Sequence, residues 1–162
     1  MPLRGRFGLA EQRVFFVTTS VKNHVRLFTS DAVMSELKEI IRTYALKHNA
    51  LVFGYALMQN HFHLLIAIRC GGPKVSAFMR DIKRVTSKTI SPGSGGIWQA
   101  RFDDVAIFSE SQFRIKLNYI HNNPVKAGLA SVAEDYPFSS AAAWISGKPD
   151  PLVTTSLNFV WP

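Results

Sequence analysis

The sequence predicts an α+β fold of the ferredoxin-like type. This is a β-α-β-β-α-β sandwich with helices packed on one face of an antiparallel sheet, here with an extra hairpin and a C-terminal helix. One reason is that short runs rich in β-branched and aromatic residues alternate with stretches whose apolar residues recur every three or four positions. Composition is another, because 47% of the 162 residues are hydrophobic, which is enough for a proper core. We therefore expect a single domain over residues 1–162, with an irregular basic arm at about 1–13 and an irregular tail at about 147–162.

The first half of the chain supplies the β-α-β-β part of this order. Its predicted elements are a strand over residues 14–19, a helix over about 31–48, and strands over residues 50–58 and 61–68. Ser30 or Asp31 can cap the helix, because a short polar side chain can accept a hydrogen bond from the first turn. A polar break at Gln59-Asn60 separates the last two strands, as in neighbours joined by a tight connection.

The second half supplies the remaining elements, after a chain break at Gly71-Gly72-Pro73. They are a helix over residues 74–90, hairpin strands over 97–102 and 105–108, a helix over 111–123 and a short helix over 139–145. The residues expected to form the buried stripe of the first of these helices are Val75, Phe78, Ile82, Val85 and Thr89. Asp103-Asp104 is expected at the turn of the hairpin.

Charge and cysteine content narrow the class of partner and the compartment. The chain has 19 Lys and Arg against 11 Asp and Glu, a net charge of +8, which favours an anionic partner such as nucleic acid. Cys70 is the single cysteine, so no internal disulfide can form and a reducing compartment fits. No apolar signal core or membrane-length run occurs, so we expect a cytoplasmic protein that does not bind membranes.

A His-x-His pair lies at the start of the third predicted strand. His61 and His63 point to the same face of that strand, because side chains alternate along it. Two imidazoles at this spacing are placed to share one metal ion or one phosphate. The simpler alternative is two packed or surface histidines, which such pairs more often are, and two histidines are only half a ligand set.

A family resemblance strengthens the metal-site interpretation. His61-Phe62-His63 after Met58-Gln59-Asn60 is similar to the His-hydrophobe-His motif of the single-tyrosine transposases of the insertion-sequence 200/605 type. The run from Tyr119 to Leu129 resembles their tyrosine helix. With Trp98-Gln99-x-Arg101-Phe102 and Tyr136-Pro137-Phe138-Ser139-Ser140, the chain resembles best the REP-associated tyrosine transposases, over about residues 14–144.

The resemblance implies the fold predicted above and a specific reaction. Tyr119 would attack a phosphate of single-stranded, hairpin-forming DNA, leaving a 5′-phosphotyrosine and a free 3′-hydroxyl for later rejoining. A phenol on a helix also fits this role by itself, although a tyrosine that covers the core is the commoner case. The resemblance further implies that Asn123 is the third metal ligand beside His61 and His63. Mg²⁺ or Mn²⁺ is the expected ion, given nitrogen and amide-oxygen ligands and phosphate chemistry.

The third ligand has alternatives. Pro124 disfavours helical geometry at Asn123, so Asn122 or a water molecule could take that place, and the Asn-Asn-Pro run could simply end the helix. His121 faces away from Tyr119 and is left out of the metal set.

Basic residues on the helix over 74–90 suggest a DNA-binding ridge. Arg80, Arg84 and Lys88 recur every four residues, with Lys83 beside them. Such a stripe is usually a solvated face, but in a chain of charge +8 we favour contact with phosphates.

The run around Trp98 adds candidate contacts with unpaired bases. Trp98, Gln99 and Arg101 could stack on bases or form hydrogen bonds with them, although Trp98 fits the core equally well. A non-catalytic nucleic-acid-binding module on the same fold is the main alternative function, and a relaxase or replication initiator is the other. The partner is expected to be single-stranded or hairpin DNA, and the protein a monomer or homodimer.

Overall fold

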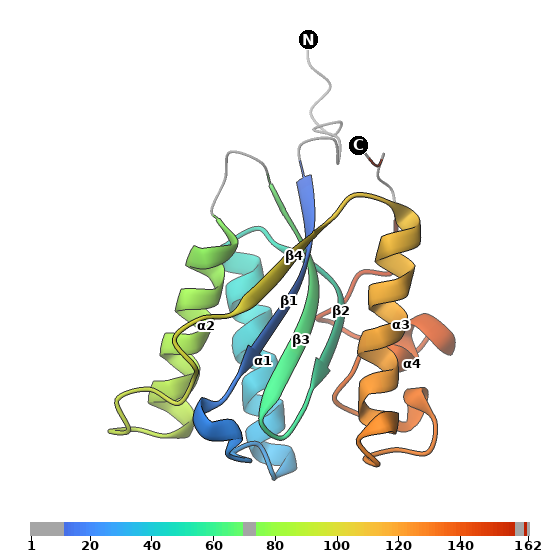
Figure 1. The fold of residues 1–162 in the computed structure, drawn as a ribbon. Coiled ribbons are helices and arrows are strands. Elements are labelled where there is room, and N and C mark those ends of the chain that lie inside the picture. Colours follow the sequence, from blue (N-terminus) through green and yellow to red (C-terminus); the bar gives the residue numbers. More distant parts are fainter. Residues whose placement is uncertain (1–11, 70–73, 158–160, 162) are drawn as a thin grey trace.

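A computed structural model describes residues 12–69, 74–157 and 161. The strands and helices are β1 (Gln12–Ser20), α1 (Asp31–Lys47), β2 (Leu51–Leu57), β3 (His61–Arg69), α2 (Val75–Ile90), β4 (Asp103–Ile107), α3 (Glu110–Lys126) and α4 (Ala141–Ile145) (Figure 1). Short 3₁₀ turns cover Lys22–His24 and Ala133–Asp135. The predicted break at Gly71-Gly72-Pro73 and most of the predicted basic arm lie outside the described residues, and the part of the arm at 12–13 belongs to β1.

The sheet has the strand order β2-β3-β1-β4, and every neighbouring pair is antiparallel. This is the ferredoxin-like arrangement, so the predicted fold class is confirmed. The pairing of β1 with β3 places Thr18 opposite His63 and Ser20 opposite His61. Both histidines therefore lie at one end of the two central strands.

The helices cover both faces of the sheet: α1 and α2 lie on one face, as the ferredoxin-like order predicts, and α3, which is outside that order, lies on the other. α1 and α2 pack with Phe62, Leu64 and Ile66 on one face. α3 packs on the other face, where Leu65 and Ala67 belong to a second apolar cluster. β3 is apolar on both faces, and each face must be removed from water by its own layer (Figure 1).

The predicted hairpin does not form. Residues 97–102 are a loop joined to the sheet by a single bridge between Trp98 and Val21, while β4 pairs with β1 instead. Asp103 and Asp104 are the first residues of β4 rather than a turn. Ile97 and Trp98 of this loop are buried, and the Trp98 ring packs against Phe28 and Phe62.

The buried stripe of α2 differs from the predicted one in its last two turns. Val75, Phe78 and Ile82 are buried as expected, but Val85 is only half-buried and Thr89 is exposed. The other buried residues of the helix are Met79, Thr86 and Ser87. Thr86 is buried because the loop after the helix covers it, and its hydroxyl accepts a hydrogen bond from the indole N–H of Trp98 at 2.6 Å.

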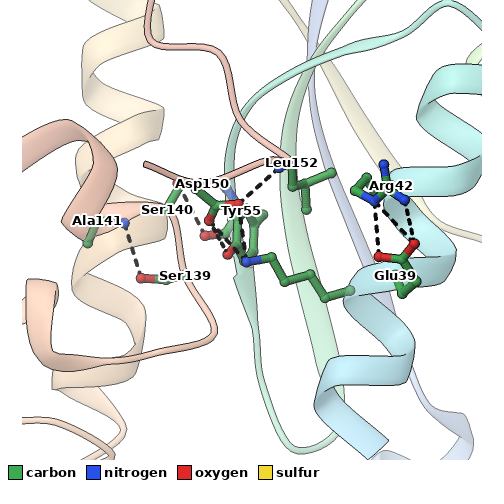
Figure 2. Close-up of polar contacts among 9 residues, drawn as sticks. Glu39, Arg42, Tyr55, Ser139, Ser140, Ala141, Asp150 and Leu152 are labelled. Carbon is green, nitrogen blue, oxygen red and sulfur yellow. Dashed lines mark hydrogen bonds and ion pairs between the residues drawn. The ribbon is translucent and has the colours of Figure 1, made fainter. Parts of the chain in front are cut away.

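The described part of the tail after residue 147 contains no helix or strand, and side-chain contacts attach it to the rest of the fold. The Tyr55 hydroxyl donates a 2.6 Å hydrogen bond to Asp150, and Lys38 of α1 pairs with the same carboxylate at 3.1 Å (Figure 2). Leu152, next to this contact, is buried. Within the described residues, no helix has the length and apolar character needed to cross a bilayer.

Candidate active site

His61 and His63 lie side by side on the α3 face of the sheet. Their ring centroids are 4.9 Å apart, and the ring of His63 stacks on Phe16 of β1 at 5.6 Å. His63 is buried and His61 is half-buried, so the pair lies at the rim of the core, as the sequence predicted. A rim position holds the rings firmly and leaves one edge open.

A neighbouring polar group holds each imidazole through its Nδ1 atom. Thr18 Oγ1 lies 2.7 Å from Nδ1 of His63, and Asn60 Oδ1 lies 2.7 Å from Nδ1 of His61. The Asn60 oxygen can only accept, so Nδ1 of His61 carries the proton and Nε2 presents a lone pair. Such second partners orient metal-binding histidines in many proteins. Thr18 was not among the predicted site residues, because only the pairing of β1 with β3 brings it beside His63.

Burial keeps both histidines neutral. It lowers the pKa of His63 to about 3, with the nearby His61 adding to the effect. Burial also lowers the pKa of His61, against an opposing hydrogen bond with Asn123. A neutral imidazole is the form that binds a metal ion, so both rings are ready to act as ligands near neutral pH.

Tyr119 lies on α3 directly beside the histidines. Its ring meets His63 edge-on at a centroid distance of 5.4 Å and Phe16 edge-on at 5.8 Å. The side chain is 44% exposed, whereas Leu117 and Ile120 on the same helix are buried. The phenol is therefore held by packing on one side and is accessible to a large substrate on the other.

Asn123 completes this group, one helical turn after Tyr119. Its amide nitrogen lies 3.3 Å from Nε2 of His63. α3 continues through Pro124 to Lys126, so Asn123 stays helical and the expected disturbance at Pro124 does not occur. Proline removes one backbone donor and only biases the residue before it. Asn122, by contrast, is exposed.

The donors present fit a divalent metal. Two neutral imidazoles present Nε2 atoms on one side, and turning the Asn123 carboxamide by 180° would place its oxygen beside Nε2 of His63. Among the described residues, no three His, Cys, Asp or Glu side chains gather at one point. A third protein ligand here would therefore be an amide oxygen. Imidazole nitrogens suit later transition ions and amide oxygens suit Mg²⁺ and Mn²⁺, so these donors fit a divalent cation without selecting one.

The predicted basic ridge on α2 lies on the other face of the sheet from Tyr119. Its four residues differ in exposure and in their contacts. Arg80 and Lys88 are exposed. Lys83 donates hydrogen bonds to the carbonyls of Gln99 at 2.6 Å and Ala100 at 3.3 Å, so it fastens the loop to α2. Arg84 is 50% exposed and lies 3.8 Å from Asp81.

A groove of about 620 Å³ lies between the end of α2 and the loop over 91–100. Its basic lining residues are Lys22, Lys83, Arg84 and Lys88. The backbone N–H of Gln99 donates to Ser20, next to the end of β3 that carries His61. Gln99 is half-buried and Arg101 is exposed, but Trp98 is only 4% exposed and belongs to the core. The structure thus favours the core role for Trp98 over stacking with bases.

The chain was compared with known protein families and structures. A family model described as "Transposase IS200 like" matches residues 12–123, a range that includes both histidines, Tyr119 and Asn123. The chain belongs to the IS200-like transposase family. The resemblance read from the histidine motif and the tyrosine helix is confirmed.

Individual members of the family are also similar. A REP-associated tyrosine transposase of Escherichia coli K12 is 33% identical over 86 residues, covering 53% of this chain and 51% of that protein. The chain thus spans about half the length of that relative. A candidate REP-associated tyrosine transposase of Haemophilus influenzae is 25% identical over 142 residues, covering 78% of each chain.

A solved structure agrees with the fold. The structure of a REP-associated tyrosine transposase bound to a REP hairpin has a TM-score of 0.73 and 24% sequence identity. The match covers 90% of this chain and 87% of that one. The family's sheet and helix arrangement is therefore shared.

Proposed function

We propose that this protein is a metal-dependent DNA nicking and rejoining enzyme, a transposase that acts on single-stranded or hairpin DNA through a 5′-phosphotyrosine intermediate. The observation that carries the proposal is the position of Tyr119. It is an exposed phenol on α3, 5.4 Å between ring centroids from His63, and both His63 and its neighbour His61 contact the amide of Asn123. A protein that only binds nucleic acid has no use for this combination.

The proposed reaction is an in-line displacement at phosphorus. The Tyr119 oxygen forms a bond to the phosphorus as the bond from phosphorus to the 3′ oxygen breaks. The phenol loses its proton and the departing 3′ oxygen gains one, which leaves the 5′ phosphate on the enzyme. Attack by another 3′-hydroxyl reverses the step and joins the strands, with no external energy source.

His61, His63 and Asn123 would hold the metal, which we propose to be Mg²⁺ or Mn²⁺. When bound, it stabilises negative charge on the phosphate as the transition state forms. The protein's own contribution is orientation. Thr18 and Asn60 fix the imidazoles, and packing against Phe16 fixes the phenol. Lys126, with Nζ 6.0 Å from the Tyr119 ring, adds positive charge beside the site.

Hairpin DNA is the proposed substrate because relatives in this family are REP-associated transposases, and one is described as bound to a REP hairpin. The net charge of +8 fits a nucleic-acid partner. We propose that the DNA backbone follows the groove beside α2, contacting Arg84 and Lys88 there and Arg80 one helical turn earlier. Gln99 and Arg101 would meet unpaired bases. Lys83 would act by holding the groove's loop.

A covalent adduct tests the proposal directly. We expect wild-type protein, mixed with hairpin DNA and Mn²⁺ and quenched with denaturant during the reaction, to carry DNA on the peptide containing Tyr119. Mass spectrometry of the digested complex gives the position. Cleavage without any adduct would point to attack by water and would contradict the proposal. Binding without cleavage would favour the nucleic-acid-binding module.

Salt dependence tests the groove. Each phosphate contact to single-stranded DNA adds about 0.7 to the slope of log affinity against log salt concentration. Lys88→Ala should therefore weaken binding and lower that slope by about 0.7. Lys148→Ala, which removes an exposed lysine from the segment after α4, is the matched control and should leave the slope unchanged. If wild-type protein, Lys88→Ala and Lys148→Ala all give the same slope, this face of α2 does not bind DNA and is simply solvated.

A further inference from the structure

The side of α3 opposite Tyr119 carries a buried polar anchor that the proposed reaction does not use. His121 is 4% exposed, and its Nε2 lies 2.8 Å from the hydroxyl of Ser140. Two residues correspond to about 200° around a helix, so His121 points away from Tyr119. The helix is therefore held on one flank while it presents its tyrosine on the other.

Ser140 connects this anchor to the sheet. Its hydroxyl accepts a hydrogen bond from the backbone N–H of Tyr55 in β2 at 3.0 Å, and its own N–H donates to the Tyr55 carbonyl at 3.0 Å. Ser140 is fully buried. Tyr55 in turn donates to Asp150, and Lys38 of α1 holds that carboxylate (Figure 2). The hydroxyl that meets His121 is thus fixed from several directions.

α3 and β2 also make close apolar contacts. A Cβ atom at Gly54 would lie 2.6 Å from Leu117 Cδ1, so the missing side chain lets the helix approach the strand. Phe53 and Phe113 meet edge-on at 5.4 Å. Apolar packing fixes the distance of the helix but is not directional. A hydrogen bond is directional and adds control over rotation about the helix axis.

We propose that His121 is a positioning residue for Tyr119, and that its hydrogen bond with Ser140 sets the rotation of α3 and so aims the Tyr119 hydroxyl at a phosphate held beside His61 and His63. The inference rests on the proposed function for its catalytic consequence. The alternative is a hydrogen bond that contributes only to stability. The two differ in what they predict for folded variants.

The test compares three variants with a matched control. His121→Leu keeps the approximate size and removes the hydrogen bond, while Ser140→Ala removes it from the other side. His121→Gln places a hydrogen-bonding atom near the position of Nε2. Thr86→Val is the control, because it breaks a buried hydroxyl contact of 2.6 Å on the opposite face of the sheet.

We expect His121→Leu and Ser140→Ala to slow single-turnover cleavage about 10- to 100-fold, because a displacement near 1 Å has that effect on a reacting group. Affinity for hairpin DNA should change less than about twofold, and His121→Gln should recover most of the rate. In the double variant His121→Leu/Ser140→Ala, the loss should be no larger than in either single variant. Thr86→Val should lower the melting temperature and leave cleavage by folded protein unchanged.

A folded His121→Leu protein that cleaves at the wild-type rate would overturn the inference. If that variant does not fold, a folded Ser140→Ala protein with the wild-type cleavage rate would overturn it in the same way.

A second measurement needs no reaction. The Tyr119 ring lies within 6 Å of two other rings, so its aromatic NMR signals depend on its orientation. They should move in His121→Leu and stay in place in Thr86→Val, with Tyr119→Phe providing the assignment. If wild-type protein forms no adduct but the Tyr119 signals shift in His121→Leu, the proposed function is contradicted and the positioning role of His121 is supported. If the adduct forms but the Tyr119 signals do not shift, the proposed function is supported and the positioning role of His121 is contradicted.

Discussion

Replacing Tyr119 with phenylalanine should reduce cleavage of hairpin DNA by at least about 1000-fold and leave binding nearly unchanged. The substitution removes one hydroxyl and keeps the ring that packs on Phe16 and His63. Lost binding should not exceed the value of one hydrogen bond, on the order of 1 kcal/mol. Gel-shift affinity and single-turnover cleavage, measured on the same preparation, separate the two effects.

The other tyrosines provide the comparison. Tyr55 and Tyr136 are buried, and their hydroxyls donate 2.6 Å hydrogen bonds to Asp150 and to the Leu57 carbonyl. Burial raises the pKa of Tyr136 to about 12 and that of Tyr55 still further, so neither is a ready nucleophile. Tyr44→Phe on α1 is the control and should cleave normally. An adduct on Tyr44, Tyr55 or Tyr136 would refute Tyr119 as the nucleophile and leave the family membership intact.

The structure reproduces the predicted arrangement of the candidate residues where local periodicity fixes it. His61 and His63 share a face because a strand repeats every two residues. Tyr119 and Asn123 share a face because four residues are about one helical turn. The fold class followed from the order of such elements. Each of these inferences needs only a segment of a few residues.

The parts that were wrong or missed depend on contacts between distant segments. Thr18 supports His63 only because β1 pairs with β3 in one register, and nothing near Thr18 in the sequence indicates that register. Trp98 was open between core and surface because its burial depends on how the loop folds over Thr86. The side of the sheet that α3 occupies is likewise decided by which faces remain uncovered, and that is a property of the whole molecule.

The predicted DNA-binding residues on the surface of α2 are a third case. Arg80, Arg84 and Lys88 do lie on the exposed side of α2, but the burial pattern of a helix does not say what meets its exposed face. Lys83 shows the limit, since its ammonium group bonds to two backbone carbonyls.

The proposed metal site gives the second large expected effect. The double substitution of His61 and His63 by alanine should abolish Mn²⁺-dependent cleavage and Mn²⁺ binding measured by calorimetry. His63 is buried against Phe16, so its loss should also cost roughly 2–4 kcal/mol of unfolding free energy, as for other large-to-small core changes. His61→Ala alone removes a half-buried candidate ligand and gives the clearer result, because the core stays filled.

Substitutions of two neighbouring asparagines test the proposed third metal ligand, and one of them serves as the matched control. Asn123→Ala should weaken Mn²⁺ binding and slow cleavage, because its amide lies 3.3 Å from His63. Asn122→Ala removes the same group from an exposed neighbouring position and should do neither. Equal effects of both substitutions would mean that the run contributes only to helix structure. A folded His61→Ala/His63→Ala protein that still cleaves with Mn²⁺ would contradict the metal site, because the Nε2 donors that define it would be gone.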